Sequence, residues 1–193
     1  MIPKFGFYCF KRKMNTKVIN LISGPACGKT LTAALIFAHL KLQGKNAEYV
    51  SEYAKKLVWL GDFENLNNQY YVSLKQFKLM KAMVGKIEYL VADCSLLQGL
   101  YYNKFYPDNT SNIEKTEKKI WDLYNSFEKN INIFLVRGDY PYEEAGRYQN
   151  EDEAKAIDAE LEKILIDNNV QYAKFKSGFD SITEILEYIN SQS

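Results

Sequence analysis

The sequence predicts an α/β fold in which a five-stranded parallel sheet carries helices on both faces. Two observations predict it. Five short apolar segments read as strands, and helix-forming stretches separate each of them from the next. Apolar strands separated by helices are typical of a parallel sheet that is covered on both sides. The predicted strands cover residues 17–22, 47–50, 87–92, 131–136 and 170–175.

The helices are predicted from apolar spacing and from stop signals. Segment 30–42 is helix-forming and ends near Gly44, and segment 52–60 ends at Gly61. Segment 67–84 carries apolar and aromatic residues at helical spacing. The other predicted helices cover residues 96–105, 113–129, 151–167 and 181–189.

The composition is that of a globular chain with one core. Of its 193 residues, 47% are apolar and 25% are charged, which is ordinary for a single domain. The 25 basic residues nearly balance the 24 acidic ones, which weakens a non-specific DNA-binding role. No apolar run approaches the roughly 18 residues of a membrane span. Three cysteines without a CxxC pair argue against a zinc site or a disulfide framework. The single histidine, His39, lies within a predicted helix, which argues against a Ser-His-Asp triad.

We divide the chain into an N-terminal extension at residues 1–16 and a core domain at residues 17–193. The extension begins with apolar residues ahead of charged ones, the reverse of a signal peptide. Met14 stands shortly before the first strand and is an alternative start. The long polar stretch 137–150 is expected to form a lid over the core domain.

The strongest motif is SGPACGKT, residues 23–30, between the first predicted strand and the first predicted helix. Its ending matches a phosphate-binding loop, in which backbone N–H groups and a helix N-terminus bind phosphate oxygens. In such a loop Lys29 reaches the β- and γ-phosphates of ATP, and the Thr30 hydroxyl binds Mg²⁺. The motif therefore predicts a P-loop NTPase of nucleotide-kinase-like arrangement with the first strand at the centre of the sheet. The expected nucleotide-binding residues are Ser23, Gly24, Pro25, Ala26, Cys27, Gly28, Lys29, Thr30 and Leu31.

Two positions in this loop stand out. Ser23 occupies the slot of the first glycine of the pattern, and a glycine follows it at Gly24. Cys27 lies beside Lys29 and a helix N-terminus, a position that lowers the pKa of a thiol. Cys27 is either a small residue that the loop tolerates or a redox switch.

Two acids follow predicted strands at the edge of the sheet where ligands bind. Asp93 comes after the third strand, where P-loop proteins place an acid that holds Mg²⁺, and it can also cap the next helix. Glu52 follows the second strand and is a candidate to accept the proton of an attacking hydroxyl; the alternative is a solvated glutamate. Which of the two is the general base stays open at this point.

The polar stretch after the fourth strand contains two of the three arginines in the chain, Arg137 and Arg147. Arginine suits planar phosphate recognition, so we expect both to act on the transferring phosphoryl group when the lid excludes water. The alternative is a surface loop whose arginines pair with Glu143, Glu144 or Glu151.

Four segments together give the chain a family resemblance: ISGPACGKT, SEYAK, LVADCSL and FLVRGDYPYEEAGRYQNEDEA. They resemble P-loop kinases of the ribosylnicotinamide-kinase type, as in the kinase domain of the NAD-biosynthesis regulator family, and small AAA-type ATP-binding proteins of bacteriophages. The resemblance covers about residues 17–190. It implies a cytoplasmic, magnesium-dependent transferase, with Lys29 and Thr30 on the phosphates and metal. It also implies Asp93 as the metal-binding acid, Glu52 as the acid after the second strand, and Arg137 and Arg147 as lid arginines.

Three functions remain in competition. The first is a kinase that acts on a small nucleoside-like acceptor, with an acceptor pocket built from Tyr53, Trp59, Phe63, Tyr70 and Tyr71. The second is a kinase for a polynucleotide or a modified DNA base, supported by the lysines of residues 75–86 and 115–119. The third is a regulatory module that binds or hydrolyses ATP without an acceptor. The sequence does not identify the acceptor or the oligomeric state.

Overall fold

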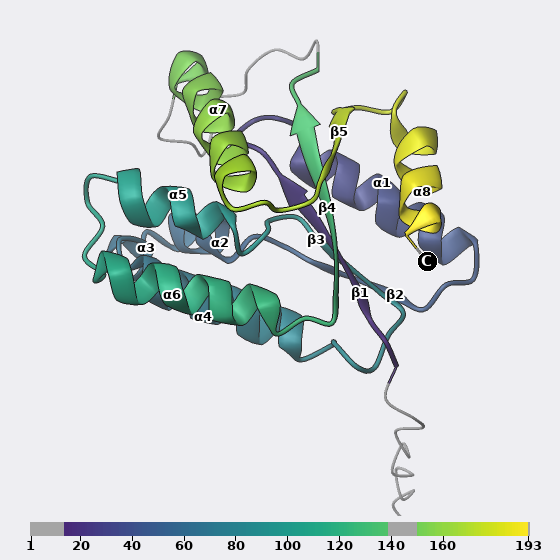
Figure 1. The fold of residues 1–193 in the computed structure, drawn as a ribbon, viewed down its shortest axis with the longest axis horizontal. Helices are drawn as coiled ribbons and strands as arrows, with labels where there is room; N and C mark the ends of the chain where they lie inside the picture. The colour runs from purple at the N-terminus through teal and green to yellow at the C-terminus, as the bar shows by residue number, and fades with distance from the viewer. Residues whose placement is uncertain (1–13, 139–149, 193) are drawn as a thin grey trace, which may run out of the picture.

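A five-stranded parallel sheet forms the centre of the molecule, as the sequence predicts (Figure 1). The computed structural model describes residues 14–138 and 150–192. The strand order is β2-β3-β1-β4-β5, so the first strand is central. Ile19 on this strand pairs with Val91 on one side and with Ile131 on the other, and every pairing is parallel. The strands are β1 (Lys17–Ile22), β2 (Ala47–Val50), β3 (Tyr89–Ala92), β4 (Lys129–Val136) and β5 (Ala173–Lys176).

Helices cover both faces of the sheet (Figure 1). Helices α1 and α8 pack on one face, and α4, α5, α6 and α7 pack on the other. The described helices are α1 (Lys29–Leu42), α2 (Tyr53–Leu60), α3 (Phe63–Leu66), α4 (Gln69–Lys81), α5 (Gln98–Phe105), α6 (Ile113–Asn125), α7 (Glu151–Asp167) and α8 (Ile182–Ser191).

Side chains of β1 alternate between the two cores. Ile19 and Leu21 belong to the core with α1 and α8, whereas Val18 and Ile22 belong to the core with α4 to α7. All four are fully buried. A strand that is apolar on both faces is expected only where helices cover both sides, and this explains why β1, β3 and β4, which are largely buried, could be recognised from the sequence.

Several element boundaries differ from the prediction. A short helix, α3, was not predicted; its N-cap is Asp62, whose side chain accepts a hydrogen bond from the backbone of Asn65. Helix α6 ends at Asn125 rather than at residue 129, because Lys129 already pairs with β1 as the first residue of β4. Strand β5 begins at residue 173, not 170, because its pairing with β4 starts there.

Residues 14–16, which the sequence analysis assigned to the N-terminal extension, pack against the core domain. The backbone N–H of Met14 donates to the Gly85 carbonyl, and the Thr16 hydroxyl donates to the Ile87 carbonyl. Residues 1–13 and residues 139–149 of the predicted lid lie outside the described residues.

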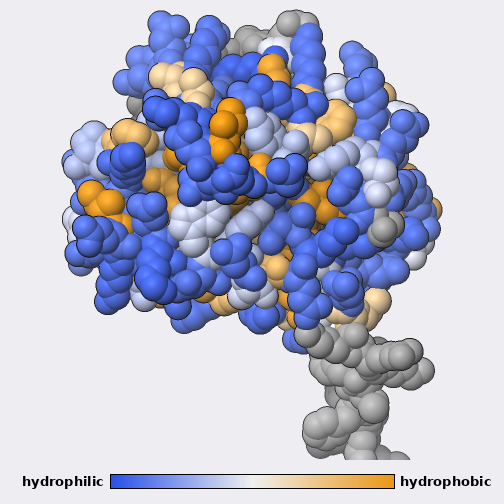
Figure 2. All heavy atoms as spheres, viewed as in Figure 1, coloured by the Kyte–Doolittle hydropathy of each residue, from blue (hydrophilic) through white to orange (hydrophobic). Residues whose placement is uncertain are grey.

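The visible surface is mostly hydrophilic. In the view of Figure 2, hydrophobic residues occur in small separate groups between hydrophilic ones. Within the part of the chain that the structure describes, no helix is both long and apolar enough to cross a membrane.

Candidate active site

The loop between β1 and α1 takes the shape that a phosphate-binding loop needs. Gly28 has a φ of 81°, and a Cβ there would lie 3.2 Å from the Cβ of Ser177. Both the backbone conformation and the close approach of Ser177 therefore require glycine at this position. Helix α1 begins at the next residue, so its N-terminal N–H groups point toward the cavity that the loop lines.

Lys29 is held inside this loop. Its Nζ donates to the carbonyl oxygens of Ser23, at 2.9 Å, and Gly24, at 2.7 Å. The residue is 8% exposed, yet it lines the cavity beside the loop. The arrangement places a cation within reach of any phosphate that the loop binds.

The first two loop residues, Ser23 and Gly24, lie behind the cavity wall and not in it. Residues 25–31 line the cavity, whereas Ser23 and Gly24 do not. Ser23 is fully buried, and its carbonyl oxygen also accepts a hydrogen bond from the side chain of Gln98. The backbone of Ser23 is therefore anchored by two side chains, Lys29 and Gln98, which the sequence pattern alone did not indicate.

Thr30 and Asp93 come together at the ends of α1 and β3. The Thr30 hydroxyl donates to Asp93 Oδ2 at 2.8 Å, and the Tyr49 hydroxyl donates to the same oxygen at 2.9 Å. Asp93 is 3% exposed, and its other oxygen, Oδ1, is buried without a hydrogen-bond partner. A buried carboxylate oxygen with no partner, beside a hydroxyl, fits a Mg²⁺ ion, which prefers hard oxygen ligands.

The second acid, Glu52, precedes the first residue of α2 and lines the same cavity as the loop. Burial, reinforced by the charge of Glu52, raises the pKa of both Cys94 and Tyr102, two other residues of the cavity wall. Glu52 therefore lies in the wall of the cavity, where a candidate general base must be.

One cavity of about 550 Å³ connects the phosphate loop with a largely uncharged region formed by α2, α4 and α5. This is within the size range of pockets that bind small molecules. Outside the loop, its charged wall residues are Glu52 and Lys55. The apolar and aromatic ones include Val58, Trp59, Leu66, Val72, Leu96, Tyr102 and Tyr106. The uncharged polar ones are Gln69, Gln76, Gln98, Ser73 and Ser95.

Of the five aromatic residues that we expected in an acceptor pocket, Trp59 lines this cavity and the other four do not. Tyr53 and Tyr71 instead pack against each other, with ring centroids 6.3 Å apart. The other aromatic residues that line it, Tyr102 and Tyr106, lie in and after α5, a helix for which we predicted no functional role.

The expectation of a lowered thiol pKa at Cys27 is wrong, and of the two interpretations the structure favours the small residue that the loop tolerates. Burial raises the pKa of its thiol, and this effect exceeds the lowering influence of Ser23, Lys29 and Arg137. The side chain is 2% exposed, and its Sγ donates to the Leu135 carbonyl. Cys27 is therefore a packed residue of the loop, because desolvation of the thiolate outweighs the nearby positive charges.

The structure describes one of the two predicted lid arginines, Arg137. Arg147 lies outside the described residues. Arg137 does not line the cavity; its Nη1 donates to the Pro25 carbonyl and its Nη2 to the Ala154 carbonyl, both at 2.9 Å. Arg137 forms an ion pair with Asp158, whereas the sequence analysis had considered only glutamates as its partners.

The fold is similar to that of several solved nucleotide-binding proteins. One is NadR protein in complex with NAD and AMP-PNP, with a TM-score of 0.64 and 12% identity over 91% of this chain. This chain spans 50% of that protein's length. A second is deoxyadenosine kinase from M. mycoides with the products dCMP and dCDP, with a TM-score of 0.56 and 16% identity over 91% of this chain and 100% of that one.

A third is YorR protein from Bacillus subtilis in complex with phosphorylated GDP. Its TM-score is 0.53 and its identity 16%, over 91% of this chain and 94% of that one. At these identities the similarity shows a shared fold. No curated protein matches the sequence. A family model described as an AAA domain matches residues 18–180, nearly the whole core, and the chain therefore belongs to that AAA domain family.

Proposed function

We propose that the protein is an ATP-dependent kinase that transfers the γ-phosphoryl group to a hydroxyl of a nucleoside, a nucleotide or a ribosyl pyridine. The observation that carries the proposal is the single cavity that joins residues 25–31 of the phosphate loop to the region between α2, α4 and α5. A hydrolysing module needs only the loop and a water molecule. A kinase also needs room for a second substrate next to the phosphates, and this cavity offers it.

In the proposed reaction the acceptor lies in the region between α2, α4 and α5. Glu52 takes the proton of the acceptor hydroxyl, whose oxygen attacks the γ-phosphorus while the bond to ADP breaks. Lys29 and the N–H groups at the start of α1 stabilise the negative charge of the phosphates. The uncharged wall with Trp59, Tyr102 and Tyr106 suits a flat base, because aromatic rings stack on each other.

Thr30 and Asp93 are the residues that would hold a Mg²⁺ ion. The ion would neutralise phosphate charge as the phosphoryl group transfers. The acids then have separate roles: Asp93 binds the metal, and Glu52 is the general base.

Two proteins of similar fold support the proposal that this chain is a nucleotide kinase. NadR binds AMP-PNP, an ATP analogue, and the M. mycoides enzyme is a deoxyadenosine kinase. Their identities to this chain are 12% and 16%, so they support a nucleotide kinase and leave the acceptor to be identified by experiment.

The test is a phosphotransfer assay with γ-labelled ATP and Mg²⁺ against a panel of acceptors. The panel contains nicotinamide riboside, the deoxynucleosides, their monophosphates, and single- and double-stranded DNA. Label in a small acceptor, at a rate at least about 100-fold above that of a Lys29→Ala variant, supports the proposal. Label in DNA alone identifies a polynucleotide kinase. ATP binding with transfer to none of the acceptors identifies a regulatory or hydrolysing module and contradicts the proposal.

A further inference from the structure

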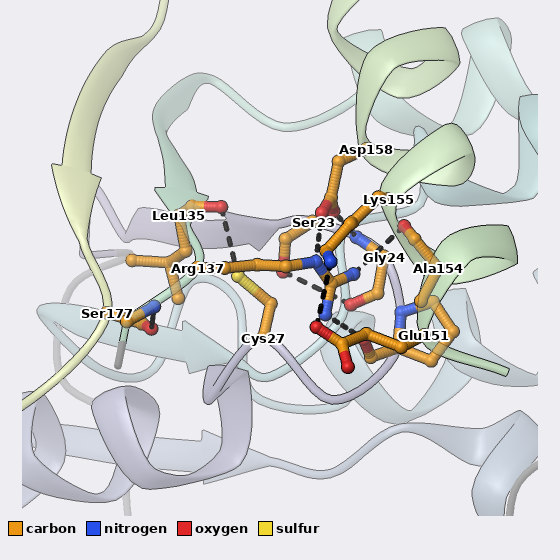
Figure 3. Close-up of polar contacts among 12 residues, drawn as sticks. Ser23, Gly24, Cys27, Leu135, Arg137, Glu151, Ala154, Lys155, Asp158 and Ser177 are labelled. Atoms are coloured by element: carbon orange, nitrogen blue, oxygen red, sulfur yellow. Dashed lines mark hydrogen bonds and ion pairs between the residues drawn. The ribbon is translucent and has the colours of Figure 1, made fainter. Parts of the chain in front are cut away.

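The Asp158 carboxylate on helix α7 contacts the phosphate loop (Figure 3). Asp158 Oδ1 accepts a hydrogen bond of 2.5 Å from the backbone N–H of Gly24. Asp158 Oδ2 lies 2.6 Å from Nε of Arg137, at the end of β4. The same guanidinium donates to the Pro25 carbonyl, so the carboxylate and the arginine together hold two consecutive loop residues.

The contact is too close for a side chain on the loop. A Cβ at Gly24 would lie 2.7 Å from the Ala154 carbonyl oxygen and 2.9 Å from Asp158 Oδ1. The helix therefore packs directly against the loop backbone, and this accounts for a glycine at position 24. The glycine displaced by one residue from the usual pattern thus serves the contact with α7.

Asp158 is not arranged to maximise folding stability. The side chains of Asp158 and Arg137 are 17% and 18% exposed. Burial raises the pKa of Asp158, and this outweighs the opposing effects of the Gly24 N–H, Arg137 and Lys29. Other titratable groups that interact with it are Cys27 in the loop and Tyr102 on α5. A partly buried carboxylate with a shifted pKa that also contacts the phosphate loop is more typical of a functional residue than of one that only stabilises the fold.

We propose that Asp158 is a positioning residue for nucleotide binding. Its carboxylate fixes the Gly24 N–H and orients Arg137 toward the Pro25 carbonyl, and so holds the first residues of the phosphate loop in place. The inference rests on the proposed function, because it assumes that the loop binds ATP. Gly24 does not line the cavity and residues 25–31 do, so Asp158 acts through the loop without contact with the phosphates. The backbone that it holds includes the Gly24 carbonyl, which accepts a hydrogen bond from Lys29.

The experiment measures the dissociation constant of Mg·ATP by calorimetry, without any acceptor, for Asp158→Ala, Asp158→Asn and a control. The control is Glu162→Gln on the same helix, which removes the ion pair with Lys174 and keeps an oxygen that can accept the 2.7 Å hydrogen bond from the Tyr172 hydroxyl. We expect Asp158→Ala to weaken binding by about 10-fold or more, the effect of one lost charge-assisted hydrogen bond. Asp158→Asn keeps an acceptor for the Gly24 N–H, and we expect about 3-fold weaker binding, because the Arg137 ion pair is lost.

The melting temperature separates positioning from plain stability. Since the site disfavours the charge of Asp158, Asp158→Asn should melt within about 3 °C of the natural chain, or above it, even though it binds ATP less well. The control should bind ATP within about 2-fold of the natural chain.

The inference is overturned if folded Asp158→Ala binds ATP within 2-fold of the natural chain, or if Glu162→Gln weakens binding as much as Asp158→Ala does. Should the alanine variant fail to fold, Asp158→Asn decides alone, and unchanged affinity overturns the inference. A natural chain that binds ATP but phosphorylates no acceptor would refute the proposed kinase, while the affinities would still decide the role of Asp158.

Discussion

The Thr30 hydroxyl lies 2.8 Å from Asp93 Oδ2 and so joins the first turn of α1 to the residue that follows β3. The second oxygen of the same carboxylate is buried without a partner. One oxygen of Asp93 is therefore held by two hydroxyl groups, and the other has no hydrogen-bond partner among the described residues. This geometry is what makes the pair a candidate for Mg²⁺ rather than an ordinary helix cap.

We predict that Asp93→Asn raises the Mg²⁺ concentration for half-maximal activity by about 10-fold or more, because an amide is a poorer ligand than a carboxylate for this ion. Tyr49→Phe is the matched control. It removes the 2.9 Å hydrogen bond to the same carboxylate and leaves both oxygens in place, so its Mg²⁺ requirement should shift by less than about 3-fold. A magnesium titration of phosphotransfer measures both variants, and full activity in excess EDTA would contradict the prediction.

We predict that Lys29→Ala lowers kcat by at least about 100-fold, the scale of one electrostatic stabiliser in a transition state. The variant also leaves the Ser23 and Gly24 carbonyls without their lysine donor, which should lower stability by about 1–3 kcal/mol. Lys41→Ala, on the last turn of the same helix and outside the cavity, should keep its activity. Steady-state kinetics and thermal unfolding measure the two effects, and near-normal turnover would show that the loop lysine has no catalytic role.

We predict that Glu52→Gln lowers kcat by about 100-fold or more with an ATP affinity within a few-fold of normal, because a general base acts on the acceptor and not on the nucleotide. Glu48→Gln on β2 is the control: Glu48 is exposed and does not line the cavity, so its activity should be unchanged. If Glu52→Gln turns over normally, Asp93 becomes the candidate base, as the sequence alone allowed.

The sheet and the loop were predictable because their signals are local. Five apolar strands, helices between them and GKT at the start of α1 each follow from short stretches of sequence. The central place of β1 followed from five strands joined by right-handed crossovers through helices.

The remote parts of the site were not predictable in the same way. Asp158 accepts a hydrogen bond from Gly24, 134 positions away in the sequence, and Gln98 donates one to Ser23, 75 positions away. Both are polar residues on otherwise ordinary helices, and only the packing of α5 and α7 against the loop gives them a role. The prediction of the aromatic residues in the acceptor pocket was largely wrong for a related reason. Tyr53 and Tyr71 follow β2 in sequence, but they pack on each other, and α5 supplies Tyr102 to the cavity instead.

We predict that Cys27 reacts with iodoacetamide at pH 8 at least about 10-fold more slowly in the folded protein than in the urea-unfolded chain. The pKa of its thiol is raised by burial, so less thiolate is present at this pH than in a free cysteine, and the side chain is 2% exposed. Raising the pH toward the shifted pKa should increase the rate in the folded protein. Mass spectrometry of the loop peptide measures the rate, and folded-state labelling as fast as in urea would restore the redox switch as an interpretation.

The last prediction separates the two arginines that the sequence placed together in a lid. Arg137 donates to the Pro25 carbonyl and pairs with Asp158, so it contributes to the shape of the free phosphate loop. We therefore expect Arg137→Ala to weaken ATP binding by about 10-fold, with a smaller effect on kcat, because its contacts exist before the reaction begins.

For Arg147 we keep the expectation from the sequence, which is contact with the phosphoryl group in the reacting complex. Arg147→Ala should therefore lower kcat strongly and leave ATP affinity within a few-fold of normal. Calorimetry and single-turnover kinetics on both variants decide between them. If both variants lose ATP affinity alike, Arg147 is a ground-state binding residue, and if Arg147→Ala changes neither quantity, stretch 137–150 contributes no phosphate contact through that residue.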